Sequence, residues 1–258
     1  MSSSAIDIRM KAQYEDRYRI LLPRRSYTIV RVDGRAFHTW TRGMNRPYST
    51  PLMEAMDYTA LELCKGVQGA RIGYVQSDEI SLLLTDFEDI ATQAWFDGNL
   101  QKICSISASI ATAAFNDYWT QERREDANAN RYPAHFDSRV FQIPDPVEVG
   151  NYFVARQKDA IRNSVAMLAQ HYHSPKELHG VSCEHLHDMI HAKGDNWNDH
   201  PARFKQGAAI VEMPAPSYTR QTPVGEVVIP ERLEWAVVDP PIFTRDRPWL
   251  DGRIPRHE

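Results

Sequence analysis

The chain has 258 residues, of which 42% are hydrophobic and 25% are charged. These proportions exclude a disordered or collagen-like chain and indicate one large globular domain, or a core with an appended half-domain. The formal net charge of -4 excludes a global positive field, so any contact with nucleic acid requires a local basic patch.

Apolar spacing, β-branched residues and turn signals predict the elements in chain order. A helix is expected over residues 5–19, a strand over 27–32, a helix over 49–66, strands over 70–75 and 80–84, a helix over 100–119 and a strand over 136–143. Further helices are expected near 146–170 and 182–192. Residues 120–134 are charged and Asn-rich, which indicates a surface loop, and residues 214–258 form a Pro-rich tail with short β-like runs such as 225–229.

The predicted strands and the helices between them follow the order β-α-β-β-α-β, which is that of the ferredoxin-like split unit. In that topology the first and third strands lie side by side and antiparallel at the centre of the sheet. The end of the 27–32 strand therefore lies beside the start of the 80–84 strand. We expect an α+β fold in which Asp33 lies near Asp78 and Glu79.

The cysteines and the lack of long apolar segments indicate the cellular compartment. Cys64, Cys104 and Cys183 are an odd number without a C-x-x-C pair, which argues against a disulfide framework or a structural zinc site. The N-terminal segment has no apolar signal region, and no stretch approaches the roughly 18 apolar residues of a membrane-spanning helix. We therefore expect a cytoplasmic protein with no membrane partner.

Three carboxylates that converge at one edge of a sheet repel one another unless a cation lies between them. Carboxylate oxygens and a main-chain carbonyl, such as that of Gly34, form a hard-oxygen ligand set that suits Mg²⁺. The corresponding reaction class is phosphoryl or nucleotidyl transfer with one or two metal ions. The alternative is that Asp33-Gly34 and Ser77-Asp78-Glu79 are simply turns, because these residue types favour loops.

The segment over residues 34–47 has the composition of a phosphate-binding loop. Its small residues offer backbone N–H groups. Positive charge around them comes from Arg35, Arg42 and Arg46. The rings of Phe37 and Trp40 either stack on a nucleobase or pack in the core. A second basic patch over residues 203–207 either binds phosphate or is a solvated loop.

Several motifs together resemble those of the tRNA-His guanylyltransferase family, including relatives that act as 3′-to-5′ polymerases. The matching segments are Ile8–Glu15, Arg31–His38, Gln76–Ser81, Phe136–Val140, Arg156–Gln157, Asn196–Asn198 and Lys205–Gly207. The resemblance spans about residues 10–207, and the combination is far more specific than any one motif.

The resemblance implies a polymerase palm domain over residues 1–145. A helical and irregular C-terminal extension, over residues 146–258, would pack on it. The implied catalytic residues are Asp33, Asp78 and Glu79, and two Mg²⁺ ions would be held by Asp33, the Gly34 carbonyl and Asp78. The implied nucleotide-binding residues are Gly34, Arg35, Ala36, Phe37, His38, Arg46, Ser77, Asn163 and Lys205.

The resemblance also implies the reaction and the partners. Family members use ATP or GTP to activate the 5′ end of a tRNA, and the 3′-hydroxyl of an incoming nucleotide then attacks the activated phosphate. The expected partners are tRNA and nucleoside triphosphates. The expected assembly is a homotetramer that binds tRNA across subunits.

One departure from the family bears on the substrate. Eukaryotic members carry an H-I-N-N-L-Y-N run after the R-Q pair, and of that run residues 158–164 clearly keep only Asn163. Because the run is tied to tRNA handling, we expect repair of 5′-truncated tRNA, chiefly by addition of G, more than strict addition of one G to tRNA-His. Two further alternatives are a palm-fold nucleotide cyclase and a non-catalytic module that binds nucleotide or RNA.

Overall fold

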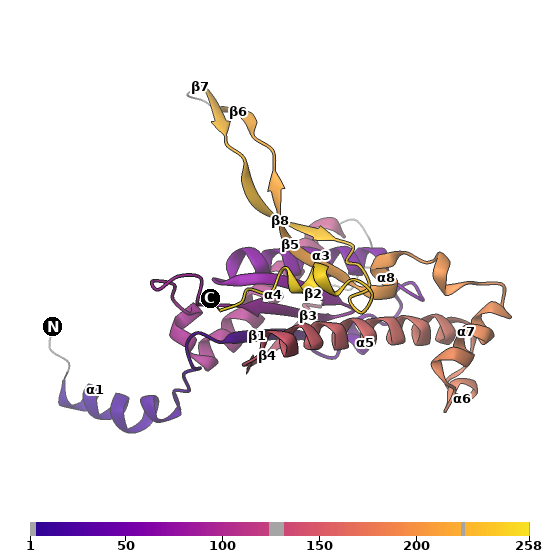
Figure 1. The fold of residues 1–258 in the computed structure, drawn as a ribbon. Helices are drawn as coiled ribbons and strands as arrows, with labels where there is room; N and C mark the ends of the chain where they lie inside the picture. Colours follow the sequence, from indigo (N-terminus) through magenta and orange to yellow (C-terminus); the bar gives the residue numbers. More distant parts are fainter. Residues whose placement is uncertain (1–3, 124–131, 223–224, 258) are drawn as a thin grey trace.

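A single large sheet forms the centre of the molecule. The computed structural model describes residues 4–123, 132–222 and 225–257. Six antiparallel strands lie in the order β4-β1-β3-β2-β5-β8, and β6 pairs with β7 in a hairpin that stands out from the body (Figure 1). The strands are β1 Tyr27–Gly34, β2 Ala70–Gln76, β3 Glu79–Leu84, β4 Phe136–Ile143, β5 Ala208–Ala215, β6 Tyr218–Thr222, β7 Gly225–Ile229 and β8 Arg232–Val238.

Helices cover both faces of the sheet. α3 (Thr50–Gly66) and α4 (Leu100–Glu122) pack on one face, and α5 (Pro146–Tyr172) packs on the other (Figure 1). The shorter helical segments are α1 Ala5–Met10, η1 Lys11–Glu15, η2 Asp16–Tyr18, α2 Phe37–Trp40, η3 Trp95–Gly98, α6 Pro175–Leu178, α7 Cys183–His191, η4 Trp197–Asp199, α8 Ala202–Gln206 and α9 Arg247–Asp251. No helix in the described part of the chain is both long and apolar enough to cross a membrane.

Alternation along β1 divides the core into two layers. Val30 and Val32 join the apolar cluster beneath α3 and α4, whereas Ile29 joins the cluster beneath α5. Successive side chains of a strand point to opposite faces, so Arg31 and Asp33 share the α5 face with Ile29. β1 is thus uncharged over its first half, and its charged residues, Arg31 and Asp33, lie near its C-terminal end.

The predicted mixture of helices and antiparallel strands is confirmed, and the elements between residues 27 and 143 lie where the sequence places them. α4 runs to Glu122 instead of ending at residue 119, because its buried face continues at i+4 spacing as far as Trp119. Residues 120–122, expected to begin the loop over 120–134, therefore belong to α4. Residues 124–131 of that loop lie outside the described residues.

The chain beyond residue 207 adds two strands to the sheet that the sequence did not predict. β5 pairs with β2, and β8 pairs with β5. The prolines in this part of the chain argue against a strand, because proline is disfavoured inside sheets. Pro214 nevertheless lies within β5. The β-like run over residues 225–229 is strand β7.

The side chain of Gln157 fastens the C-terminal segment to α5. Its Nε2 donates to the Pro241 carbonyl at 2.8 Å, and its Oε1 accepts from the Phe243 N–H at 2.7 Å. Gln157 is buried, and Phe243 is part of the apolar cluster beneath α5. The segment after β8 is therefore part of the packed core on this face.

Candidate active site

Asp33 and Asp78 come together where β1 ends and β3 begins. Asp33 lies opposite Glu79 in the β1–β3 register, and the Gly34 N–H donates to the Asp78 carbonyl at 3.0 Å. The β2–β3 connection is the two-residue turn Ser77-Asp78, in which Ser77 has a φ of 49°. Such left-handed backbone is typical of tight hairpins. The topology thus brings both aspartates to one edge of the sheet.

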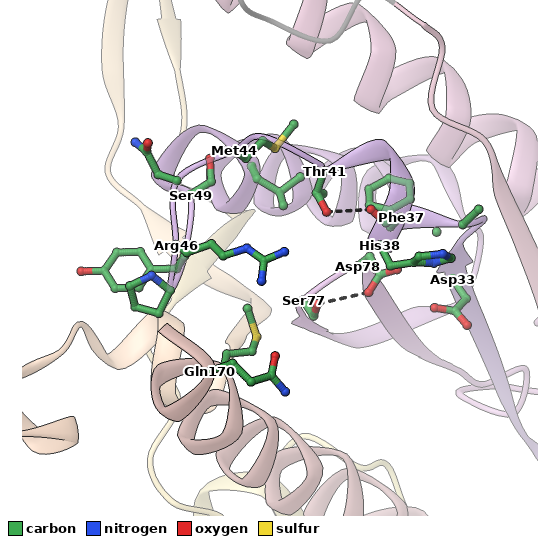
Figure 2. A pocket seen from close by; sticks show the side chains of 17 residues that line it. Asp33, Phe37, His38, Thr41, Met44, Arg46, Ser49, Ser77, Asp78 and Gln170 are labelled. Atoms are coloured by element: carbon green, nitrogen blue, oxygen red, sulfur yellow. Dashed lines mark hydrogen bonds between the residues drawn. The ribbon is translucent and has the colours of Figure 1, made fainter. Parts of the chain in front are cut away.

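A cavity of about 440 Å³ opens at this edge, with Asp33 and Asp78 on one side of it (Figure 2). Arg46, from the loop between α2 and α3, lies on the other side and points its guanidinium into the cavity (Figure 2). Gln170, near the end of α5, also lines it. The cavity is therefore acidic on one wall and basic on the other.

Burial and neighbouring charge raise the pKa of both aspartates. For Asp33 the largest cause is burial and the next is the charge of Asp137 on β4. For Asp78 burial again comes first, followed by the charge of Asp33. The two ionised carboxylates therefore repel, and a cation between them would relieve the repulsion.

The residues at this edge suit Mg²⁺, which needs few protein ligands, better than a metal ion whose ligands all come from the protein. Asp33 and Asp78 supply carboxylate oxygens, and Gly34 supplies a carbonyl at the same edge. In the described residues no group of three or more His, Cys, Asp or Glu side chains is placed to hold a metal ion. Mg²⁺ commonly takes one or two protein carboxylates and completes its shell with water and substrate phosphates. The donor set therefore suits a metal that arrives with a phosphorylated ligand.

The loop that follows β1 offers the groups that bind phosphate. Ala36 has left-handed backbone, with φ 55° and ψ 34°, immediately before α2. When a residue with left-handed backbone is next to one with right-handed backbone, their N–H groups point to the same side. These N–H groups then form a concavity that binds anions. Ala36, His38 and Arg46 all line the cavity. Arg46 forms no salt bridge with any carboxylate in the described part of the chain.

The rings of Phe37 and Trp40 pack in the core, so the alternative in which they stack on a base is wrong. The Phe37 side chain is 4% exposed, and its ring centroid lies 5.2 Å from that of Trp40 and 5.1 Å from that of Phe136. Trp40 donates its Nε1–H to the Tyr132 carbonyl at 2.9 Å. Phe37 therefore lines the cavity as an anchor of the loop, with its ring facing the core.

Glu79 differs from the two aspartates in its surroundings. Its carboxylate accepts from Arg156 Nη1 at 3.2 Å and lies 3.9 Å from Arg31 Nε, and Glu79 does not line the cavity. Arg156 belongs to the R-Q pair on α5, so one residue of that pair holds Glu79 while Gln157 holds the C-terminal segment. The sequence prediction of three converging carboxylates is thus realised as two in the cavity and one in an ion-pair cluster beside it.

Two charged residues of β4 adjoin Asp33 and were missed by the sequence analysis. Asp137 lies opposite Asp33 in the β1–β4 register, and Arg139 Nη2 lies 3.8 Å from an Asp33 carboxylate oxygen. The signal was available, because the ferredoxin-like order pairs the first strand with the fourth as well as the third. Alternation along residues 136–143 would then have placed Asp137 and Arg139 beside Asp33.

The remaining predicted nucleotide-binding residues fall into two groups. Ser77 and Asn163 line a second cavity of about 70 Å³, which shares Tyr48, Ser49, Leu52, Ser77 and Met167 with the first. Arg35 and Lys205 line neither cavity. Arg35 is exposed, and Lys205 donates its Nζ to the Asn198 carbonyl at 2.6 Å and lies 5.3 Å from the centre of the Trp197 ring.

Curated relatives resemble the chain over most of its length. An uncharacterized protein of Acanthamoeba polyphaga mimivirus is 29% identical over 223 residues, which cover 78% of this chain and 75% of the relative. A probable tRNA(His) guanylyltransferase of Dictyostelium discoideum is 27% identical over 209 residues, which cover 76% of this chain and 79% of the relative.

Solved structures extend the similarity to the whole fold. A bacterial tRNA(His) guanylyltransferase-like protein in complex with ATP superposes with a TM-score of 0.83 at 38% identity, covering 97% of this chain and 99% of that one. A bacterial protein of the same description in complex with GTP gives a TM-score of 0.76 at 37% identity, with the same coverage. The tRNA(His) guanylyltransferase of Saccharomyces cerevisiae, at 20% identity and a TM-score of 0.67 over 86% of this chain and 95% of that one, shares the fold.

The family model described as tRNA-His guanylyltransferase matches residues 8–144, which is more than half of the chain and includes Asp33, Asp78 and Arg46. That stretch holds both aspartates of the cavity and the loop that faces them. The chain therefore belongs to the tRNA-His guanylyltransferase family of nucleotidyltransferases.

Proposed function

We propose that the chain is a Mg²⁺-dependent enzyme that adds nucleotides, chiefly G, to the 5′ end of tRNA in the 3′-to-5′ direction, after ATP or GTP activates the 5′ phosphate. One observation carries the proposal: Asp33 and Asp78 face Arg46 across a single cavity. A triphosphate with bound Mg²⁺ has the charge pattern that this cavity complements. The ATP and GTP in the bacterial relatives support the same ligands here.

Each wall of the cavity has its own part in the proposal. Asp33, Asp78 and the Gly34 carbonyl would hold the two Mg²⁺ ions. When bound, the metal supplies charge stabilisation to the phosphate oxygens and favours loss of the proton from the attacking hydroxyl. The Arg46 guanidinium neutralises phosphate oxygens from the opposite wall, and the backbone N–H groups around Ala36 bind them from the side. Positioning and charge thus supply most of the catalysis.

The other predicted residues act around this centre. Glu79 contributes by holding Arg156 and Arg31, of which Arg31 lies close enough for its charge to act on Asp33. Ser77 and Asn163 contact the nucleotide from the second cavity. Arg35 and Lys205 would contact phosphates outside the cavities, and these phosphates would belong to tRNA.

We further propose that the central unit is a ferredoxin-like palm. The order β4-β1-β3-β2 with α3 and α4 on one face supports this assignment. Residues 1–145 would form the catalytic palm, and residues 146–258 the extension that covers it through α5, β5 and β8. The shared sheet and the Gln157 contacts support a close association of the two parts.

Repair of 5′-truncated tRNA is proposed over strict addition of one G to tRNA-His. Residues 158–164 of α5 keep little of the eukaryotic run beyond Asn163, and Asn163 lines the second cavity. A site that depends less on these residues is expected to accept more than one tRNA. The proposed location is the cytoplasm.

A homotetramer is the proposed assembly. None of the residues from Ala5 to Tyr18 is buried, and this helical segment stands away from the sheet (Figure 1). Ile6, Ile8 and Tyr14 are 59%, 59% and 62% exposed. A lone helix of this length is marginal in water, so contact with another subunit would stabilise it.

Incorporation of labelled GTP tests the proposal. A 5′-monophosphorylated tRNA that lacks its first nucleotide is compared with an intact tRNA-His transcript, with Mg²⁺ and ATP present. Preferential extension of the truncated tRNA is expected, whereas preference for intact tRNA-His would favour the addition of one G. Cyclised product from GTP alone, or RNA binding with no metal-dependent incorporation, would contradict the proposal and favour the cyclase or the non-catalytic module.

A further inference from the structure

A chain of contacts joins the large cavity to a carboxylate that the proposed reaction does not use. Tyr48 lines both cavities, and its ring meets the His200 ring edge-on at 5.9 Å between centroids. His200 Nε2 lies 3.1 Å and 3.2 Å from the two carboxylate oxygens of Asp195. Phe204 completes the group, with its ring 4.7 Å from that of Tyr48 and 5.7 Å from that of His200.

Asp195 is held from several elements at once. Besides His200, it accepts a hydrogen bond from the Tyr172 hydroxyl at 2.7 Å, at the end of α5, and one from the Asn196 N–H at 2.7 Å. Burial raises the pKa of Asp195, but the hydrogen bonds from Tyr172, Asn196 and His200 outweigh burial and leave the pKa below its ordinary value. Asp195 is therefore a firm anchor for the His200 ring.

Tyr48 is two residues from Arg46 and directly before Ser49, the residue at the N-cap position of α3. The chain between residues 46 and 49 forms the basic wall of the cavity, and Tyr48 is the aromatic contact from that segment to α8. The His200 side chain is 17% exposed and lines neither cavity. Of the two rings that it meets, Tyr48 and Phe204, only Tyr48 lines the large cavity.

We propose that His200 is a positioning residue: the Asp195–His200 pair holds the Tyr48 ring, and Tyr48 in turn holds Arg46 in the orientation that binds the nucleotide triphosphate. This inference rests on the proposed function for its ligand. It assigns the segment over residues 195–204 a role in nucleotide affinity, separate from the metal-binding aspartates. Loss of the contact weakens binding and leaves turnover at saturation nearly unchanged, because no group at the reacting atoms is removed.

The test measures the Kd of the full chain for ATP and GTP with Mg²⁺, together with KM and kcat for GTP incorporation. His200→Ala is expected to raise Kd and KM about tenfold with kcat within about twofold of the wild type. His200→Gln retains an N–H near the position of Nε2, and Kd within about threefold of the wild type is expected. His191→Ala is the matched control, because His191 is exposed on α7; its Kd should be unchanged.

A double-mutant cycle separates positioning from general destabilisation. If His200 acts through Tyr48, the double variant Tyr48→Ala with His200→Ala binds no more weakly than Tyr48→Ala alone. Additive losses, or a His200→Ala variant whose melting temperature falls while Kd and KM stay the same, would overturn the inference and leave the proposed function intact. If the wild-type chain bound neither ATP nor GTP, the proposed function would fail and this inference with it.

Discussion

Burial and repulsion between carboxylates oppose ionisation of the two aspartates in the cavity. Asp33 and Asp78 each have a raised pKa, chiefly through burial and then through a neighbouring carboxylate. A carboxyl whose pKa is raised by folding opposes folding when it is ionised. Stability is therefore reduced above the raised pKa, and the reduction disappears as the pH falls through it.

Removing one of these charges should stabilise the metal-free protein. Asp78→Asn is expected to raise the melting temperature at pH 7 by about 2 °C or more, and the gain should vanish below about pH 4, where both forms are neutral. The difference in melting temperature is measured by thermal unfolding in the presence of a chelator across a pH series. Asp117→Asn, on the exposed side of α4, should show no such gain. A lower melting temperature for Asp78→Asn at pH 7 would contradict the charge repulsion.

Arg46 is the residue whose loss should affect the triphosphate most. Arg46→Ala is expected to raise KM for ATP and GTP by about 10-fold to 100-fold, because a charge-assisted hydrogen bond contributes about 1.5–3 kcal/mol. Steady-state kinetics with each nucleotide measure the change. Arg42→Ala serves as the control, since Arg42 is exposed and lines neither cavity. Equal effects of the two substitutions would show that the guanidinium in the cavity has no special role.

At the level of secondary structure, the close approach of α2 to the end of β1 positions the backbone that we propose binds phosphate. A Cβ at Gly34 would lie 2.4 Å from the Phe37 ring, so the glycine allows Phe37 to fold back beneath the strand end. Phe37 then packs against Trp40 and Phe136, and these contacts fix where the loop leaves the sheet.

Gly34→Ala should therefore destabilise the fold by about 1–3 kcal/mol, which is the usual effect of overpacking a core. Urea unfolding gives the change in the free energy of unfolding. Gly66→Ala is a matched control, because its nearest neighbour, Ile110 Cδ1, would lie 3.7 Å from the new Cβ, an ordinary contact. A Gly34→Ala variant as stable as the wild type would mean that the ring moves aside freely.

Sequence patterns could predict the pairing of β1 with β3 and the meeting of Asp33 with Asp78, because alternation and the β-α-β-β-α-β order fix both. They could not place β5 or β8. Pro214 weakens the strand pattern of β5, and both strands form only because the edge of β2 is free to pair. They also could not separate Glu79 from the aspartates. That separation depends on Arg156, which is distant in sequence and reaches Glu79 only once α5 packs on the sheet.

At the scale of the whole molecule, the sheet and the Gln157 contacts make the two halves of the chain one packed unit. β5 and β8 extend the sheet that begins with β1, and α5 covers the face opposite α3 and α4. The contact from Gln157 to the Phe243 N–H is buried, and the contact to the Pro241 carbonyl is part-buried.

Gln157→Leu should leave the Phe243 N–H and the Pro241 carbonyl without their partner. A loss of about 2–4 kcal/mol in the free energy of unfolding is expected, because each of the two groups loses a hydrogen bond that contributes about 1–2 kcal/mol. Chemical unfolding followed by fluorescence should still show one transition, because both halves share the sheet. Two separate transitions in the wild-type chain would contradict the shared core. Gln170→Leu, at an exposed position of α5, is the control.

We propose that Asp33 and Asp78 carry metal-dependent nucleotide addition and that the fold stays intact without their carboxylates. The measurement is the rate of labelled GTP incorporation into 5′-truncated tRNA by the wild type, Asp33→Asn and Asp78→Asn across a Mg²⁺ titration. Mg²⁺-dependent incorporation is expected for the wild type, with a loss of at least about 1,000-fold in each variant and unchanged far-UV circular dichroism. Turnover near the wild-type rate in either variant would show that its aspartate does not carry the reaction.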